Sequence, residues 1–73
     1  MTHTVDGQRV RRLRRRRGLT VAAVAKAAGC SQWMIYKIEQ GKHQPSPQLY
    51  VSMRKALNAR NRDLQPVGPG GPA

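Results

Sequence analysis

The chain has 73 residues, enough for one small folded domain, and a formal net charge of +11 from fourteen basic and three acidic side chains. Because such a charge repels itself unless an anionic partner relieves it, we expect a polyanionic partner, with nucleic acid ahead of an anionic membrane surface. The single cysteine excludes an internal disulfide, and with only two histidines in the chain we expect no metal site and no cofactor.

The first predicted helix spans residues 7–17 and is strongly basic. Asp6 fits its N-cap, and Gly18 fits the residue that ends it. Val10 and Leu13 are its only large apolar residues, and they lie three apart on one face. The rest of its surface carries seven arginines: Arg9, Arg11, Arg12, Arg14, Arg15, Arg16 and Arg17. We interpret this helix as mainly a solvated cationic surface.

Two short helices follow, with a glycine between them. Thr20 fits the N-cap of an alanine-rich stretch that ends at Gly29. Ser31 fits the N-cap of a second stretch, over residues 32–40, which ends before Gly41. Two short helices joined by a tight turn, the second preceded by a hydroxyl cap, are typical of a helix-turn-helix.

A fourth helix is predicted after Ser46, with Pro47 at its first position, where the missing amide is not needed. Tyr50, Met53 and Leu57 recur at i, i+3 and i+7 and mark its buried face.

The remaining sequence divides the chain into three parts. Residues 61–64 allow one further helical turn, whereas the Gly- and Pro-rich end has too little apolar content to fold. We predict an N-terminal arm over residues 1–5, a helical domain over 6–64 and a disordered tail over 65–73. Without any alternating β pattern, the fold class is all-α, a compact bundle of four to five helices. The first residues lack the apolar core of a signal peptide, so we expect a cytoplasmic protein.

The helices 21–28 and 32–40 are expected to pack closely. Ala25 is small where they approach each other, and Gly29 can adopt a positive φ at the turn. An inward-facing set is predicted from the helical spacing: Val24, Ala28, Cys30, Ile35 and Ile38. This leaves four residues on the exposed side of the helix 32–40 as candidates for contacting bases: Gln32, Trp33, Tyr36 and Lys37. Trp33 has the alternatives of folding over the bundle or closing a dimer contact. Tyr36 fits either a phosphate contact through its hydroxyl or packing against a neighbour. Lys37, like Gln32, has the alternative of an ordinary solvated side chain.

Residues 10–57 resemble the Xre-type helix-turn-helix family of phage repressors and Cro proteins. The resemblance rests on R-G-L-T at 17–20, A-x-x-A-G-C-S at 25–31, I-x-x-I-E-Q-G-K at 35–42 and the following Pro45-Ser46. It implies a lambda-repressor-like bundle of five helices whose third helix lies in the major groove of DNA. Related proteins commonly bind as dimers to two half-sites about 34 Å apart.

The resemblance also implies roles for individual residues. Gln32, Trp33 and Lys37 match the family's base-contacting positions, and their side chains suit adenine, a thymine methyl and guanine, respectively. A second set is expected to contact the DNA backbone: Arg14, Thr20, Ser31, Gln40, Lys42, His43 and Gln44. Arg14 is further implied to pair with Glu39. Structural roles fall on five residues: Ala25, Gly29, Ile35, Ile38 and Glu39.

Three positions depart from the family pattern. Ala23 stands where an acidic or amide residue often completes a capping box. Val21 replaces a polar residue that could contact phosphate, and Arg54 stands where a small residue is usual. The changes at Ala23 and Val21 weaken the contact that the helix 21–28 is expected to make with the DNA backbone. Arg54 leaves the packing of the fourth helix open.

We expect a sequence-specific regulator that binds double-stranded DNA and acts as a repressor, associated with the nucleoid when bound, with a homodimer as a possible state. One alternative is an antitoxin or accessory factor that acts through a protein partner. Another is an RNA-binding protein that uses the arginine-rich helix. An enzyme is not expected, because the sequence lacks clustered acids, histidines or an activated nucleophile, and Cys30 reads as a small buried apolar residue.

Overall fold

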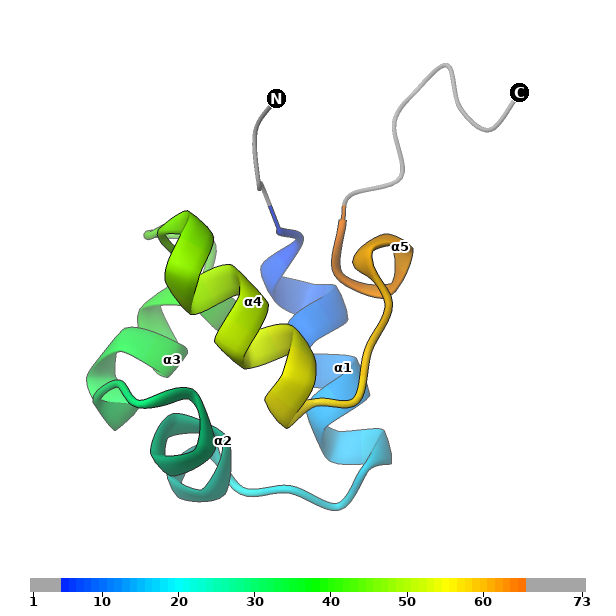
Figure 1. Cartoon of the computed structure of the whole chain (residues 1–73), viewed down its shortest axis with the longest axis horizontal. Helices are drawn as coiled ribbons and strands as arrows, with labels where there is room; N and C mark the ends of the chain where they lie inside the picture. The colour runs from blue at the N-terminus through cyan, green and yellow to red at the C-terminus, as the bar shows by residue number, and fades with distance from the viewer. Residues whose placement is uncertain (1–4, 66–73) are drawn as a thin grey trace.

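The computed structural model describes residues 5–65 and contains five helices, with no strand in that range. They are α1 (Gly7–Arg16), α2 (Val21–Ala28), α3 (Gln32–Glu39), α4 (Pro47–Ala56) and α5 (Asn61–Leu64), as Figure 1 shows. The predicted all-α bundle of four to five helices is therefore confirmed. Most of the predicted arm (residues 1–4) and of the predicted tail (66–73) lies outside the described residues.

The helices begin at the residues that the sequence indicates. The Asp6 carboxylate accepts the backbone N–H of Gln8 at 2.9 Å, at the start of α1. Hydroxyl groups cap the next three helices by accepting a backbone N–H at 3.0 to 3.1 Å: Thr20, Ser31 and Ser46. Each of these side chains satisfies a backbone donor that has no partner within its helix. The four predicted N-caps are thus confirmed.

The turn between α2 and α3 depends on Gly29. Its φ of +76° lies in the left-handed region, which glycine adopts without steric cost. The next residue, Cys30, then donates its backbone N–H to the Ala25 carbonyl at 3.0 Å. This hydrogen bond satisfies a carbonyl at the end of α2, and α3 begins after a turn of only three residues, 29–31.

The core lies where α1 to α5 meet, and it is built from the apolar face of each helix. Eight side chains are almost completely buried: Val10, Val24, Ile35, Ile38, Tyr50, Met53, Leu57 and Leu64. The predicted buried face of α4 is among them and is confirmed. The Tyr50 hydroxyl donates to Asn61 Oδ1 at 2.8 Å, and Arg54 donates to the Ala59 carbonyl at 3.4 Å. Arg54 therefore serves the turn after α4 and does not disturb its packing.

The start of α1 lies directly against the end of α3, backbone to backbone. A Cβ atom at Gly7 would lie 2.3 Å from the carbonyl oxygen of Ile38 and 2.5 Å from that of Glu39. These distances are far below van der Waals contact, so only glycine fits there. The sequence alone indicates only that Gly7 follows the N-cap, because spacing along the chain does not show which distant segments pack together.

The folded domain begins one residue earlier than predicted, at Val5. This side chain is buried with the core, and its backbone N–H donates to Gln44 Oε1 at 2.8 Å. Gln44 Nε2 donates back to the Val5 carbonyl at 3.3 Å. The N–H of Asp6 donates to the Leu64 carbonyl at 2.7 Å, which joins the beginning of the domain to its end. Val5 is thus part of the bundle and not of an arm.

Candidate nucleic-acid interface

One side of α3 is anchored in the core, and the other faces solvent. Ile35 and Ile38 are completely buried, and Ala25 of α2 is 2% exposed beneath them. On the opposite side Gln32 is exposed, Trp33 is 56% and Tyr36 51% exposed, and Lys37 is half-buried. We call these four residues the reading face. A large exposed aromatic pair on a firmly anchored helix indicates a surface that contacts a partner.

Trp33 contacts two neighbouring side chains, those of Lys37 and His43. The Lys37 ammonium group is 5.4 Å from the centre of the Trp33 ring. The centre of the His43 ring, from the segment between α3 and α4, lies 5.4 Å from that of Trp33, and the two ring planes are tilted by 56°. A cation near an aromatic ring is attracted by the electrons of the ring face, so these contacts restrict the orientation of Trp33. The reading face therefore presents a partly preorganised apolar plate beside a positive charge.

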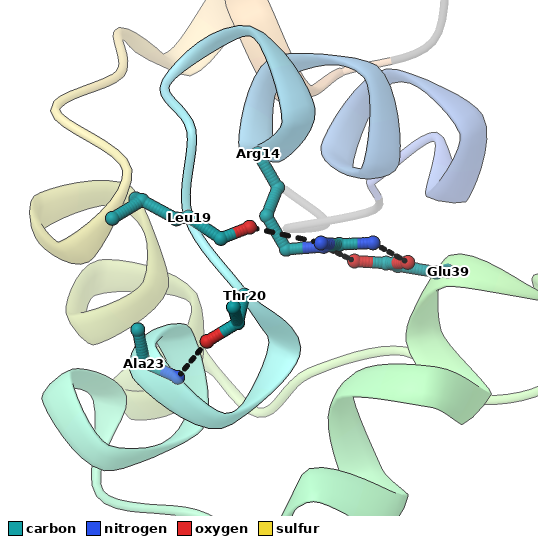
Figure 2. Close-up of polar contacts among 5 residues, drawn as sticks. All are labelled: Arg14, Leu19, Thr20, Ala23 and Glu39. Carbon is teal, nitrogen blue, oxygen red and sulfur yellow. Dashed lines mark hydrogen bonds and ion pairs between the residues drawn. The ribbon is translucent and has the colours of Figure 1, made fainter.

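Arg14 and Glu39 join α1 to the end of α3 (Figure 2). Arg14 Nε donates to Glu39 Oε2 at 2.7 Å and Nη2 donates to Oε1 at 3.3 Å, in a bidentate geometry. Nη1 also donates to the Leu19 carbonyl, at 2.9 Å, in the segment before α2. The side chains are only 14% and 6% exposed. The predicted pair thus forms, and it holds three segments of the helix-turn-helix together.

This pairing changes the role of Arg14. All three guanidinium nitrogens already donate to protein oxygens, and little of the side chain reaches solvent. Arg14 therefore acts as a positioning residue for α3, and we leave it out of the proposed phosphate contacts.

Two of the hydroxyl caps also fit a role at phosphate groups. The Thr20 and Ser31 oxygens accept backbone N–H groups of their own helices, as Figure 2 shows for Thr20 and Ala23. Both residues are exposed, and each hydroxyl keeps its hydrogen for donation to an outside acceptor. They mark the N-termini of α2 and α3, where the helix dipole favours an anion.

The segment after α3 divides into exposed and engaged side chains. Gln40, Lys42 and His43 are exposed and lie beside the end of α3. Gln44, by contrast, uses its amide oxygen and nitrogen to hold the Val5 backbone. The predicted phosphate contacts of this segment therefore reduce to the first three residues, and Gln44 has a structural role.

The arginine-rich segment has two populations of side chains. Arg9 donates to the Arg62 carbonyl at 3.3 Å, and Arg17 donates to the carbonyls of Leu57 and Asn58 at 3.1 and 3.0 Å. With Arg14, three of the seven arginines bind protein oxygens. The prediction of a solvated surface is wrong for Arg14, which is 14% exposed, whereas Arg9 is half-buried and Arg17 stays exposed. The other four are exposed and make no side-chain hydrogen bond or ion pair with residues 5–65: Arg11, Arg12, Arg15 and Arg16.

The described part of the chain gives little support to three other features: a reactive cysteine, a metal site and a membrane-spanning helix. Cys30 is half-buried against the core, and burial raises the pKa of its thiol, which disfavours the reactive thiolate. Within residues 5–65, no three His, Cys, Asp or Glu side chains are grouped so that they could hold a metal ion. None of the helices in this range is both long and apolar enough to cross a membrane.

Comparison with known proteins identifies the class to which this fold and site belong. A family model described as a helix-turn-helix domain matches residues 7–66. A protein of Archaeoglobus fulgidus, described as an uncharacterised HTH-type transcriptional regulator, is 36% identical over 56 residues, which cover 77% of this chain and 80% of that protein. The chain therefore belongs to the helix-turn-helix family of DNA-binding transcriptional regulators, and the resemblance to the Xre-type family is confirmed.

Solved structures agree with this assignment. The restriction-modification controller protein C.AhdI of Aeromonas hydrophila matches with a TM-score of 0.73 and 28% identity, over 78% of this chain and 86% of that chain. The DNA-binding domain of the P22 c2 repressor matches with a TM-score of 0.75 and 26% identity, over 85% of this chain and 82% of that chain. Both similarities extend over most of the five-helix bundle.

Proposed function

We propose that this chain represses transcription by binding a specific duplex sequence through α3, thereby excluding the polymerase. The observation that carries the proposal is the reading face: exposed aromatic and amide side chains and a half-buried lysine on a helix that two completely buried isoleucines anchor in the core. An α-helix fits the major groove, where each base pair presents a distinct pattern of donors and acceptors. Rigid anchoring matters because hydrogen bonds to base edges depend on position to within a fraction of an ångström.

Three side chains carry the proposed sequence preference. Gln32 can form a bidentate pair with adenine, Lys37 can donate to guanine, and the Trp33 ring can pack on a thymine methyl. Tyr36, on the same face, is 51% exposed and can donate its hydroxyl to a base edge or a phosphate. Each well-formed base contact contributes about 1–3 kcal/mol of discrimination.

A second group fixes the position of the protein on the duplex. We assign phosphate contacts to the caps Thr20 and Ser31 and to three exposed residues after α3: Gln40, Lys42 and His43. Contacts to phosphates set orientation and register and do not distinguish sequences. The proposal includes no catalytic activity and requires no cofactor.

Selection of bound sequences from a random duplex pool tests this function directly. The parent protein should select a defined motif, and Lys37→Ala should relax the preference at one position of that motif. Lys55→Ala is the matched control, since it removes an equal charge from the exposed last turn of α4. A uniform loss of affinity across all sequences in Lys37→Ala would contradict base reading.

The same selection determines how many copies bind. An inverted repeat with half-sites about 34 Å apart would establish a dimer on the operator, and a single short site would establish a monomer. Purification of the chain from its native cells with a stoichiometric protein partner would favour the accessory-factor alternative.

A further inference from the structure

The four arginines without protein partners lie on the outward side of α1, away from Val10 and Leu13. We call Arg11, Arg12, Arg15 and Arg16 the outer arginines. With about 3.6 residues per turn, side chains four apart lie above one another along a helix. The outer arginines therefore form two rows, one with Arg11 and Arg15 and one with Arg12 and Arg16.

The contacts of α1 show which row borders α3. On one side of α1, Gly7 packs on the α3 carbonyls and Arg14 pairs with Glu39. Arg11 follows Gly7 by four residues and precedes Arg14 by three, so it lies on that side. On the other side, Arg9 contacts the Arg62 carbonyl of α5. The row of Arg12 and Arg16 follows Arg9 by three and seven residues and therefore borders α5.

Two surface hollows that flank α1 separate Arg11 from Arg12 and Arg16, whereas a third, on its outward side, is lined by Arg11, Arg12 and Arg15. Arg11 and Gln8 of α1 line a groove together with Tyr36 of α3 and Gln40, the residue that follows α3. Arg12 and Arg16 instead line a depression that also contains Asp63 of α5. Arg11 thus lies across a groove from the reading face, and Arg15 follows it one turn later in a hollow lined by Gln8, Arg11 and Arg12. Arg12 and Arg16 face a carboxylate at the far side of α1.

The two acidic residues in the α1–α3 groove, Asp6 and Glu39, do not neutralise Arg11. Asp6 accepts backbone N–H groups at the start of α1, and Glu39 is paired with Arg14. The charge of Arg11 is therefore available to an outside anion. Gln40, proposed above to contact phosphate, lies in the same groove, so a phosphate strand that passes Gln40 comes next to Arg11.

We propose that Arg11 and Arg15 bind phosphates of the same duplex that α3 reads, beyond the base pairs that the reading face contacts. This inference rests on the proposed function, because α3 must first orient the duplex. It assigns the two rows different tasks: Arg11 and Arg15 extend the contact along the DNA backbone, whereas Arg12 and Arg16 remain solvated. Like charges four residues apart repel each other on a free helix, and bound phosphates relieve that repulsion.

Two double variants with equal charge separate the rows: Arg11→Ala with Arg15→Ala, and Arg12→Ala with Arg16→Ala as the matched control. The single tryptophan of the chain is on the reading face, so its fluorescence reports duplex binding. Each lost phosphate contact lowers the slope of log K against log salt by about 0.9, so the first variant should lose about 1.8. The control should lose less than half of that. Both should select the parent motif.

Duplex length supplies a second readout. Extending the selected site by flanking base pairs should raise the affinity of the parent protein severalfold, and the Arg11/Arg15 variant should lose that gain. Melting temperatures should stay the same or rise in both variants, because removing like charges relieves repulsion. A melting temperature that falls only in the Arg11/Arg15 variant would assign that row a structural role and overturn the proposal.

The remaining outcomes distinguish this inference from the function on which it rests. Equal loss of slope in both double variants would show diffuse attraction, and no loss in either would show a solvated surface; each result overturns the inference alone. An Arg11/Arg15 variant that loses affinity only for structured RNA, when RNA and duplex DNA compete at matched salt, would also overturn the inference. If the parent protein selects no duplex motif, the proposed function itself fails.

Discussion

The two helices that meet at the Arg14–Glu39 pair differ sharply in charge. The basic segment that forms α1 carries seven arginines between residues 9 and 17, whereas α3 carries one lysine and one glutamate. Nevertheless α3 presents the surface suited to bases, because its exposed side chains combine an amide, aromatic rings and a single ammonium group. The helix that we propose to read DNA is therefore not the one with the highest charge density.

This difference indicates a division of labour. A dense row of cations attracts any polyanion in proportion to its charge, and salt weakens that attraction steeply. A mixed polar and apolar face discriminates among base pairs and contributes little to the salt dependence. In the proposed mode of binding, the division depends on a rigid junction between α1 and α3, since both helices would contact one duplex at the same time.

The largest expected effect comes from breaking this junction at Gly7. Gly7→Ala places a Cβ 2.3 Å from the Ile38 carbonyl oxygen and 2.5 Å from that of Glu39. Alanine gains about 1 kcal/mol of helix propensity over glycine, but overpacking against fixed backbone costs about 3 kcal/mol or more. We expect a net loss of about 2 kcal/mol or more in the free energy of unfolding, measured by urea denaturation.

Gly18→Ala is the control for this change. Its Cβ meets nothing within 4 Å, but its φ is +71°, so only backbone strain of about 1 kcal/mol is expected. If both variants lose the same stability, the close approach of α1 to α3 is not the reason that glycine is required at position 7.

The second expected effect tests the ion pair of the same junction. Glu39→Gln leaves the Arg14 guanidinium, 14% exposed, without its counter-charge. Breaking a buried pair on one side costs about 3 kcal/mol or more, and we expect a value near 2–3 kcal/mol because Arg14 keeps its bond to the Leu19 carbonyl. Thermal denaturation checks this.

Replacing both partners sharpens the test. Arg14→Met with Glu39→Met should lose less stability than Glu39→Gln alone, because no uncompensated charge remains. A loss below about 0.5 kcal/mol in the single variant would show that the pair behaves as an exposed surface pair.

The third prediction separates reading from folding. Gln32→Ala should cost about 1–3 kcal/mol of discrimination at one base pair while changing the free energy of unfolding by less than about 0.5 kcal/mol. Gln48→Ala, at an exposed position in the first turn of α4, is the control and should leave binding to the selected motif unchanged. Fluorescence titration against the motif and its single-base variants measures both. Equal losses on all variant sites would show that Gln32 does not read a base.

The fourth prediction concerns the two uses of one hydroxyl group. Ser31→Ala removes the cap of α3 and should cost about 1 kcal/mol of stability. Ser31→Asp keeps a capping oxygen and should retain stability, but its carboxylate repels phosphate, so DNA affinity should fall severalfold. Wild-type affinity in the aspartate variant would contradict a phosphate contact at this position.

The smallest expected effect is at Cys30. Because burial raises the pKa of its thiol, the thiolate fraction at pH 8 should be lower in the folded chain than in the unfolded chain. Iodoacetamide should therefore alkylate the folded protein more slowly than the protein in urea. The raised pKa stabilises the fold fully below the ordinary pKa of a thiol, and this contribution is lost as the pH rises through the raised value. Equal alkylation rates would remove Cys30 from the packed set.

Much of the fold was predictable because its signals are local. Asp6, Thr20, Ser31 and Ser46 cap helices through their own neighbours in sequence, and Gly29 ends α2 by its own backbone freedom. Helix ends differ from prediction by one residue: α1 stops at Arg16 and α3 at Glu39, where the following residue acts as the C-cap. The reading face follows equally from helical spacing, because a helix with two buried isoleucines has only one other side.

Contacts between distant segments were not predictable in the same way. Nothing near Gly7 in the chain indicates that the α3 carbonyls lie against it, and nothing near Gln44 indicates that it binds Val5. The seven arginines look equivalent in sequence, yet three bind carbonyl or carboxylate oxygens of other segments. Which arginines remain available to an anion depends on the side of α1 that each neighbouring helix covers.

The sequence by itself thus determined the first four helices, their N-caps and the face of α3 that meets solvent, and it allowed a fifth turn over residues 61–64. These features depend on backbone hydrogen bonds and side-chain spacing within a few residues. The tertiary structure alone decided how α1 is set against α3 and which cations stay unpaired. Those outcomes depend on packing between segments tens of residues apart, where a carbonyl or a carboxylate from one helix meets a glycine or a guanidinium of another.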